Sequence, residues 1–447
     1  MTAAHGTTSP VVVQQAGYYV DAHRRFAANG GSRGPEWLRA LRGGAIARFG
    51  ELGFPTTGEE EWRFTNVTAL VETAFERPAE LEPPVAAEEL DPLLLGDGAP
   101  HRLVFVNGRF SPALSRVAGF PAAVRVESLQ AALAREPALI EPHLGRVAEF
   151  SDQAFRALNT AFLDDGAFVH IATGVTLAEP IQLLFLTVPG ATPFVTHPRS
   201  LIVVGSGSRA TVVETYVSIG AGRYWTNAVT EIVAGDGARV DCHRIQRESE
   251  HAYHVATTES RQGRDSTVNL HLVAFGSALA RHDLRTRLEG AGATALLNGL
   301  YLLRDQQHVD HHTVIDHRAP HCESHEYFNG VLDAQARSVF TGRIIVRPGA
   351  QRTDSKQTNN NMLLSAEARA DSQPQLEIYA DDVKCTHGST TGPLDQRHVF
   401  YLRSRGLDAT AARQLLTYGF AAEILERMEV SALRDQLDGI VRARVWG

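Results

Sequence analysis

The chain has 447 residues, of which 43% are hydrophobic and 21% charged, with 43 basic and 51 acidic side chains. This composition can fill a packed core and argues against global disorder. The net charge of −8 does not favour nucleic-acid binding. The longest largely apolar run, Ile181 to Val188, has eight residues, far short of a membrane span.

Three cysteines, Cys242, Cys322 and Cys385, are too few for a disulfide framework. The N-terminus lacks the basic and apolar regions of a signal peptide. We therefore expect a soluble cytoplasmic protein, in a reducing compartment where thiols stay available.

The first 165 residues are predicted to form a mostly helical N-terminal domain with some strand. Helical spacing of apolar residues predicts a helix from Pro35 to Leu52, ended by Gly53. Further elements are a strand at Arg102 to Asn107, a helix near Glu127 to Arg135, and a helix capped by Ser151. The acidic segment from Gly58 to Val67 is interpreted as a solvated face, and the Pro-rich residues 76 to 100 as a linker or surface excursion.

From Gly166 the helical period disappears and short β-branched runs follow one another. Polar glycine turns, each followed by an alternating strand, begin at Gly205, Gly235, Gln262 and Gly290, with spacings of 30, 27 and 28 residues. A near-constant interval of this kind is typical of stacked coils that bury one continuous core. Residues 166 to 392 are therefore predicted to form a right-handed parallel β-helix, with each strand burying one face.

The sequence supports neither a dinucleotide-binding loop nor a P-loop. The loop GSGSRA at Gly205 lacks a third glycine and precedes a strand rather than a helix, and no GxxxxGK[ST] motif occurs. We do not expect the chain to hydrolyse ATP by itself.

Residues 393 to 447 are predicted to form a C-terminal helical domain. Asp408 is suited to cap one helix and Ser431 a second. Leu416, Phe420 and Ile424 recur at i+4 on one face. Two short helices cannot form a large core alone, so this face must pack on the β-helix or on another protein.

The segment QLEIYADDVKCTHG, Gln375 to Gly388, holds the most specific chemistry. On a strand Val383, Cys385 and His387 share one face. A thiol beside an imidazole can bind a borderline metal or act as a nucleophile and base. A buried cysteine beside a hydrogen-bonded histidine is the structural alternative.

A second polar stretch, His308 to Phe328, contains six of the 19 histidines and Cys322. It suits a metal site, with Asp310 and Asp316 fixing imidazole tautomers. The alternative, which we favour, is structural strand and turn material. The run Asn359 to Asn361 is likewise interpreted as a structural Asn ladder.

The run QLEIYADDVKCTHGSTTGPLDQRHVFYLRSRG, from Gln375 to Gly406, closely resembles the signature of the SufB/SufD family of iron–sulfur cluster assembly scaffolds. The likeness continues upstream through VFTGRIIVRPGAQRTDSKQTNNNMLLS, Val339 to Ser365, and covers roughly the last two-thirds of the chain. The segment at Gly58 to Val67 is similar to an N-terminal E-x-W-R-x-T element of the SufD branch. Residues 343 to 384 contain no cysteine, which SufB-like chains carry there, so the chain resembles SufD.

The resemblance implies a non-catalytic scaffold subunit that pairs with a SufB-like paralogue and a SufC-like ABC ATPase. His387 would offer its neutral imidazole to iron or to a nascent cluster at the SufB interface, and Cys385 is a less certain second ligand. The helical tail with Leu416, Phe420 and Ile424 would dock the ATPase. We expect no permanently bound cofactor in the isolated chain, and an exposed edge strand invites homodimer formation.

Three alternatives remain open at this point. One is a stand-alone His-rich metalloprotein built on residues 308 to 325. Another is a purely structural β-helix scaffold in which His387 is inert. The third is a carbohydrate-active β-helix enzyme, against which the missing signal peptide argues.

Overall fold

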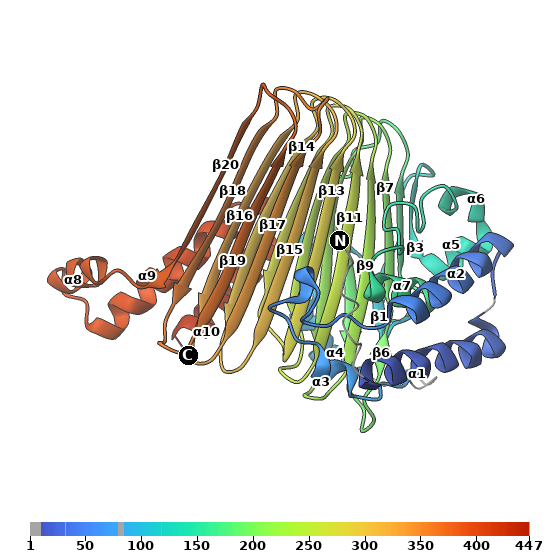
Figure 1. Cartoon of the computed structure of the whole chain (residues 1–447), viewed down its shortest axis with the longest axis horizontal. Helices are drawn as coiled ribbons and strands as arrows, with labels where there is room; N and C mark the ends of the chain where they lie inside the picture. Colours follow the sequence, from blue (N-terminus) through green and yellow to red (C-terminus); the bar gives the residue numbers. More distant parts are fainter. Residues whose placement is uncertain (1–9, 32, 79–84, 118, 447) are drawn as a thin grey trace, which may run out of the picture.

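A computed structural model describes residues 10–31, 33–78, 85–117 and 119–446, and a stack of parallel strands forms its centre (Figure 1). The strands wind into a parallel β-solenoid of about 8 turns, which confirms the predicted β-helix. From β7 onward successive strands alternate between two sheets, so each of these strands pairs with the strand two positions along the chain. The right-handed sense of the coil stays a prediction.

The first sheet ends at the last strand of the solenoid, β20. Its strands in spatial order are β2 (Arg109–Phe110), β1 (His101–Val106), β5 (Ile181–Thr187), β8 (Arg209–Ser218), β10 (Arg239–Arg247), β12 (Thr267–Ala274), β14 (Thr294–Leu303), β16 (Glu323–Leu332), β18 (Asp354–Leu363) and β20 (Lys384–Pro393).

The second sheet faces the first across the solenoid interior and ends at β19. Its strands in spatial order are β19 (Arg369–Ile378), β17 (Arg337–Val346), β15 (His308–His317), β13 (Leu279–Leu288), β11 (Tyr253–Gln262), β9 (Trp225–Ala234), β7 (Arg199–Val204), β4 (Ala167–Ile171) and β3 (Val124–Ser128), with β6 (Val195–Thr196) also beside β9.

The repeated glycine turns lie at equivalent positions in successive coils and bring the strands that follow them into register. Arg209, Arg239, Thr267 and Thr294 are successive ladder partners, each just after one of the predicted turns. Gly237 has φ of +64°, a left-handed conformation that glycine adopts without strain. The turn glycines therefore allow identical corners to stack.

The N-terminal region covers the outer face of the second sheet and also extends both sheets. Trp225 of β9 meets the rings of Tyr19 and Phe155 at centroid distances of 6.0 and 5.6 Å. Strands β1 and β3 come from before residue 166 yet pair with β5 and β4. The domain boundary at 165 stays a prediction.

The helices and helical turns of this region are α1 (Pro10–Phe26), η1 (Ala27–Gly31), α2 (Glu36–Leu52), η2 (Glu60–Trp62), α3 (Thr68–Val71), α4 (Ala87–Leu90), η3 (Asp91–Leu93), η4 (Gly96–Gly98), α5 (Leu129–Arg135), α6 (Pro137–Ile140) and α7 (Ala154–Ala161). Helix α2 ends at Gly53, as predicted. The predicted cap at Ser151 is wrong, because α7 begins after Gln153, whose side chain makes no capping hydrogen bond.

Three C-terminal helices follow the solenoid, one more than predicted: α8 (Gln396–Ser404), α9 (Ala409–Leu425) and α10 (Ser431–Trp446). Asp408 caps α9, as predicted, by accepting from the Ala411 amide. Helices α9 and α10 pack on the outer face of the first sheet, where Ile424 and Leu437 join Ile245 in one apolar cluster. Helix α8 projects beyond the solenoid (Figure 1).

The prediction that each strand buries only one face is wrong for the middle coils. In β9, nine of ten residues are buried, because helices cover the outer face as well. Within the described ranges, no helix is long and apolar enough to cross a membrane.

Candidate functional site

Strand β20 carries the predicted C-x-H pair and forms the open end of the first sheet. Among the described residues, its ladder partner is β18 alone. Cys385 and His387 lie opposite Ser355 and Gln357, both buried in the solenoid interior. The predicted alternation is confirmed, since both side chains belong to the inward-facing columns of the coil.

Cys385 is half-buried at the end of the interior. Its side chain contacts a small apolar cluster that includes Ile344, Val346 and Val383. Burial first, and the nearby Asp354 carboxylate second, raise the pKa of the Cys385 thiol. The thiol is therefore held in its protonated form near neutral pH, and only removal of that proton would make it a strong metal ligand.

His387 is exposed, because no further coil covers it. Beneath it the same column continues through Gln357 to Glu326, which are ladder partners in turn. Gln357 Nε2 donates to Glu326 Oε2. Burial raises the pKa of Glu326 to about 7, against the opposing effect of the donors Thr313 and Gln357.

The residues Glu326 and Gln357 were not singled out from the sequence. The signal was present, because Glu326, Gln357 and His387 recur at the coil interval, 31 and then 30 residues apart. Their polar character at an interior position becomes visible only when the register is known.

In the described part of the chain, no group of three or more His, Cys, Asp or Glu side chains is placed to hold a metal ion. Among the described residues, His387 and Cys385 therefore do not form a complete metal site by themselves.

The histidine-rich stretch occupies β15, the turn after it and the first half of β16, and several of its side chains are engaged structurally while His321 and His325 are exposed. On the outer face, Thr65 of the N-terminal region donates to Asp310 at 2.5 Å and lies 3.1 Å from His308 Nε2. On the inner face, the His311 ring stacks on Tyr301 at 5.3 Å. His317 Nε2 lies 2.9 Å from Ser324 Oγ.

The segment at Gly58 to Val67 also has a structural role. Its acidic residues are exposed, as predicted. Trp62 is buried beneath the Arg281 guanidinium, 3.7 Å from the ring centroid, and Arg281 pairs with Asp310 at 2.7 Å. This segment therefore fastens the N-terminal region to the solenoid.

The asparagine run has a structural role, as predicted, but among the described residues only Asn360 bonds to an asparagine of the adjacent coil. Asn361 Nδ2 donates to Asn359 Oδ1 at 2.8 Å, and Asn359 Nδ2 donates to the Tyr301 hydroxyl at 3.0 Å. Asn360 points outward and donates to Asn329 at 3.3 Å.

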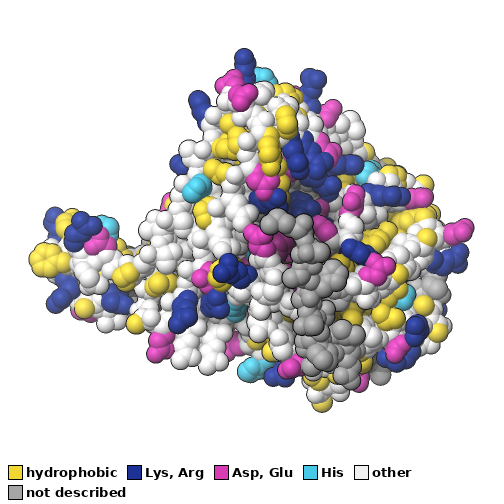
Figure 2. Space-filling view, viewed as in Figure 1, with side chains coloured by type: hydrophobic (Ala, Val, Ile, Leu, Met, Phe, Trp, Pro, Cys, Tyr) yellow, Lys and Arg dark blue, Asp and Glu magenta, His cyan; other side chains and the backbone are white. Residues whose placement is uncertain are grey.

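The three predicted docking residues of α9 differ in exposure. Ile424 is fully buried within the chain, Phe420 packs partly against the same cluster, and Leu416 is half-buried. The exposed apolar side chains nearby are Phe400 and Tyr401 of α8, with exposed fractions of 73% and 56%, and Leu415 of α9. Figure 2 shows hydrophobic and basic side chains together at the tip of this projecting arm.

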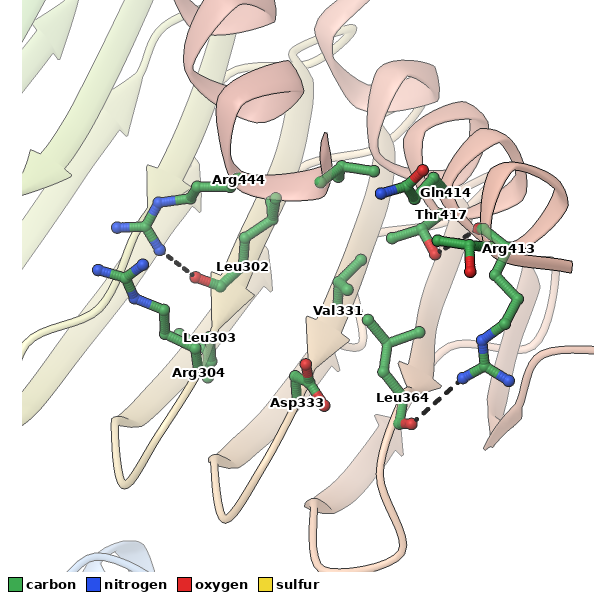
Figure 3. Close-up of a pocket in the computed structure, with 12 residues that line it drawn as sticks. Leu302, Leu303, Arg304, Val331, Asp333, Leu364, Arg413, Gln414, Thr417 and Arg444 are labelled. Atoms are coloured by element: carbon green, nitrogen blue, oxygen red, sulfur yellow. Dashed lines mark hydrogen bonds between the residues drawn. The ribbon is translucent and has the colours of Figure 1, made fainter. Parts of the chain in front are cut away.

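A groove of about 340 Å³ separates α9 and α10 from the turns that follow β14, β16 and β18 (Figure 3). Arg444 donates to the Leu302 carbonyl at 3.1 Å on one side, and Arg413 to the Leu364 carbonyl at 3.5 Å on the other. None of the predicted site residues lines this groove, which serves as a seam between helices and solenoid.

Comparisons with known proteins identify the family. Residues 187–420 match the model of the SUF system FeS cluster assembly SufBD core domain, and residues 14–183 match that of the SufBD protein N-terminal region. The chain belongs to the SufBD family. The two matches together cover the N-terminal region, the solenoid and most of α9.

Relatives of the chain are similar over nearly full length. An iron–sulfur cluster assembly SufBD family protein of Synechocystis is 37% identical over 412 residues, 90% of each chain. The iron–sulfur cluster assembly protein SufD of Escherichia coli is 30% identical over 95% of this chain and 96% of its own. SufD of Bacillus subtilis is 25% identical over 92% and 94%. The chain is therefore a SufD-like member of an iron–sulfur cluster assembly family.

Proposed function

We propose that the chain is the SufD-like subunit of a cluster assembly scaffold, in which it pairs with a SufB-like paralogue and a SufC-like ABC ATPase. The supporting observation is the open end of the solenoid, where β20 exposes a full strand edge and carries His387. ATP hydrolysis belongs to the ATPase partner, and this subunit is non-catalytic.

The paralogue pairs along β20. Within the described parts of the chain, this ten-residue strand has a hydrogen-bonded neighbour on one side only, and most of its residues are exposed. An unprotected edge of this length is a template for strand addition from a second chain. A partner strand added here would enclose His387 and Cys385 between the two subunits.

His387 offers imidazole to iron or to the nascent cluster, which are the cargo of the reaction rather than resident cofactors. The partner and the cluster sulfides complete the ligand set, because this chain supplies only one histidine and a protonated thiol. Cys385 shapes the apolar floor of the site and becomes a ligand only on deprotonation.

The ATPase docks on the C-terminal helices. The side chains of α8 fit this role, because Phe400 and Tyr401 are exposed beside Arg403 and Arg405. Leu416 and Phe420 contribute from α9 through their exposed portions, while Ile424 holds α9 on the sheet. A partner surface with an apolar pocket and an acidic rim would complement this arm.

The test is co-purification followed by reconstitution. Tagged chain is recovered from its own cells, and the recovered proteins are identified and their iron and sulfide are measured. In the reconstituted complex, His387→Ala should leave the subunits associated but lower the cluster yield by at least about tenfold, the lower end of what even indirect ligand partners cost. His325→Ala is the matched control, because His325 is exposed on the outward face of the same sheet.

A normal cluster yield in His387→Ala would leave the chain as a purely structural scaffold. A lone chain or homodimer with stoichiometric metal would instead support a metal site in residues 308 to 325. The engagement of His308, His311 and His317 in packing and hydrogen bonds argues against that second outcome.

A further inference from the structure

The interior beneath His387 contains a polar column that packing alone does not require. Glu326 and Gln357 are almost fully buried, at 2% and 1% exposure. Gln357 Oε1 has no hydrogen-bond partner within the described residues, and Glu326 Oε1 has only the nearby Thr313 hydroxyl, without a well-formed hydrogen bond. Buried polar atoms without partners are costly, so their position at the end of the solenoid calls for a function.

The column leads to the open end of the solenoid. Glu326, Gln357 and His387 occupy the same inward-facing position in three successive coils. In-register parallel strands lie about 4.8 Å apart, which allows like-facing amides to form a ladder. Gln357 uses its Nε2 on Glu326, and its free Oε1 is the remaining amide group for the next side chain in the column, His387.

The space for the amide comes from the opposite sheet. A Cβ at Gly342 of β17 would lie 2.1 Å from Gln357 Nε2, so the amide packs against bare backbone. Only glycine at this position leaves room for the Gln357 head group.

We propose that Glu326 and Gln357 are positioning residues for His387, in that the protonation state of Glu326 sets the orientation of the Gln357 amide and thereby the tautomer of the imidazole. This inference rests on the proposed role of His387 as a ligand for iron or cluster.

With Glu326 ionised, its carboxylate accepts from Gln357 Nε2, and Oε1 is presented toward His387 as an acceptor. Of the two ring nitrogens of His387, the inner one is nearer Gln357 and the outer one is nearer the open end. A ring that carries its proton on the inner nitrogen donates to Gln357 Oε1, and its outer nitrogen is then unprotonated and able to bind metal. Ionised Glu326 therefore favours the ligating tautomer.

With Glu326 protonated, its hydroxyl donates to Gln357 Oε1 after the amide turns by half a rotation. The Nε2 group then faces His387 as a donor and favours a bare inner nitrogen. The proton of the neutral ring moves to the outer nitrogen, where it blocks metal binding. The Glu326 carboxylate takes up one proton from solvent, and the neutral ring releases its proton from the inner nitrogen and takes one up at the outer nitrogen, so the two states differ by one proton in total.

The other titratable groups facing Glu326 are neutral near pH 7. On β15, burial lowers the pKa values of His311 and His317 to about 4. The Thr313 hydroxyl of β15 also acts on Glu326, and Leu297 precedes it in its own column. Burial of Glu326 raises its pKa to about 7, so the column changes state near neutral pH.

The test is an NMR titration of the isolated chain with ring-labelled histidine, in which His387→Gln assigns the His387 signal. In the wild type, the His387 ring shifts should show a second inflection near pH 7 in addition to its own titration. Glu326→Gln should abolish that inflection, and Gln357→Met, which keeps the side-chain length without the amide, should do the same. Glu323→Gln, an exposed position on the same strand, should leave it unchanged.

A second measurement connects the column to assembly. In the reconstituted complex, Glu326→Gln should flatten the dependence of cluster yield on pH between about 6 and 8 without changing subunit association. His387 shifts that are identical in wild type, Glu326→Gln and Gln357→Met would overturn the inference. An inflection that depends on Glu326, together with normal cluster yield in His387→Ala, would overturn the proposed function and leave the column intact.

Discussion

One of the contacts that anchor the N-terminal region to the solenoid is the buried carboxylate Glu231 of β9. Its oxygens accept from the backbone amides of Gly145, Val147 and Ala148 at 2.8–3.1 Å. Arg199 of β7 donates to the same carboxylate at 2.6 Å, and both side chains are fully buried. Replacing Glu231 by Gln keeps the shape but removes the negative charge that the buried guanidinium requires.

Removing one partner of a buried ion pair costs about 3–5 kcal/mol, because the other charge stays buried without compensation. At about 1.4 kcal/mol per factor of ten, local opening around residues 145–148 should become at least about a hundredfold more frequent. Hydrogen exchange followed by mass spectrometry measures this directly in peptides spanning residues 143–149. Glu179→Gln is the control, since Glu179 is exposed on the solenoid.

The expected result is fast exchange in that peptide and near-normal exchange in peptides from β14 and β16, which lie several coils away. Exchange rates of residues 145–148 within about threefold of the wild type would refute the reasoning. In that case the amides would be protected by packing rather than by the Glu231 carboxylate.

Three further predictions concern the solenoid interior and the C-terminal seam. Gly299→Ala should lower the free energy of unfolding by about 1–3 kcal/mol, because the added Cβ would lie 2.0 Å from Phe328 Cδ1. Gly388→Ala is the control, because open space surrounds that position. Thermal unfolding compares the two variants. The Glu326 carboxyl should make the folded protein less stable as pH rises, because its folded pKa of about 7 lies above the ordinary value of 4.5. Its contribution to the free energy of unfolding is complete below pH 4.5 and is lost, by about 3 kcal/mol, as pH rises through 7. Denaturation from pH 5 to 8 should therefore show a flatter dependence of stability on pH in Glu326→Gln than in the wild type. Arg444→Met should loosen the end of α10, because it removes the donor to the Leu302 carbonyl and leaves that carbonyl without this partner. Limited proteolysis should detect the change, with a smaller effect for Asp435→Asn at an exposed position of the same helix.

The solenoid could be predicted from the sequence because its corners are local. A glycine turn that adopts positive φ needs few contacts outside itself, and its recurrence sets the coil interval directly. The shared face of Cys385 and His387 was predictable for the same reason, since strand alternation depends only on position along the chain.

The covering of the outer faces was not predictable in this way. Trp225 and Ile245 are buried by helices that come from opposite ends of the chain, so no local pattern marks their outer faces as interior. Helix α8 was missed because its apolar residues Phe400 and Tyr401 are adjacent and exposed, which produces no helical spacing. The cap at Ser151 failed because α7 starts by packing on the sheet rather than by a side-chain hydrogen bond.

The composition of the column beneath His387 argues that the end of the solenoid was shaped by function. In successive coils this position holds Val212, Cys242, Leu270, Leu297, Glu326, Gln357 and His387. Apolar residues fill it until the last three coils, where burial of polar groups is costly.

Other buried charges in the solenoid are compensated, which makes the contrast informative. Arg244 binds Glu214 through two nitrogens, at 3.0 and 2.6 Å, so that pair satisfies itself within the core. Among the described residues no cation pairs with Glu326, whose neighbours are the neutral Thr313 hydroxyl and Gln357 amide. A stabilising role explains the first pair but not the second, and proximity to the open end of the solenoid explains why the uncompensated carboxyl lies where it does.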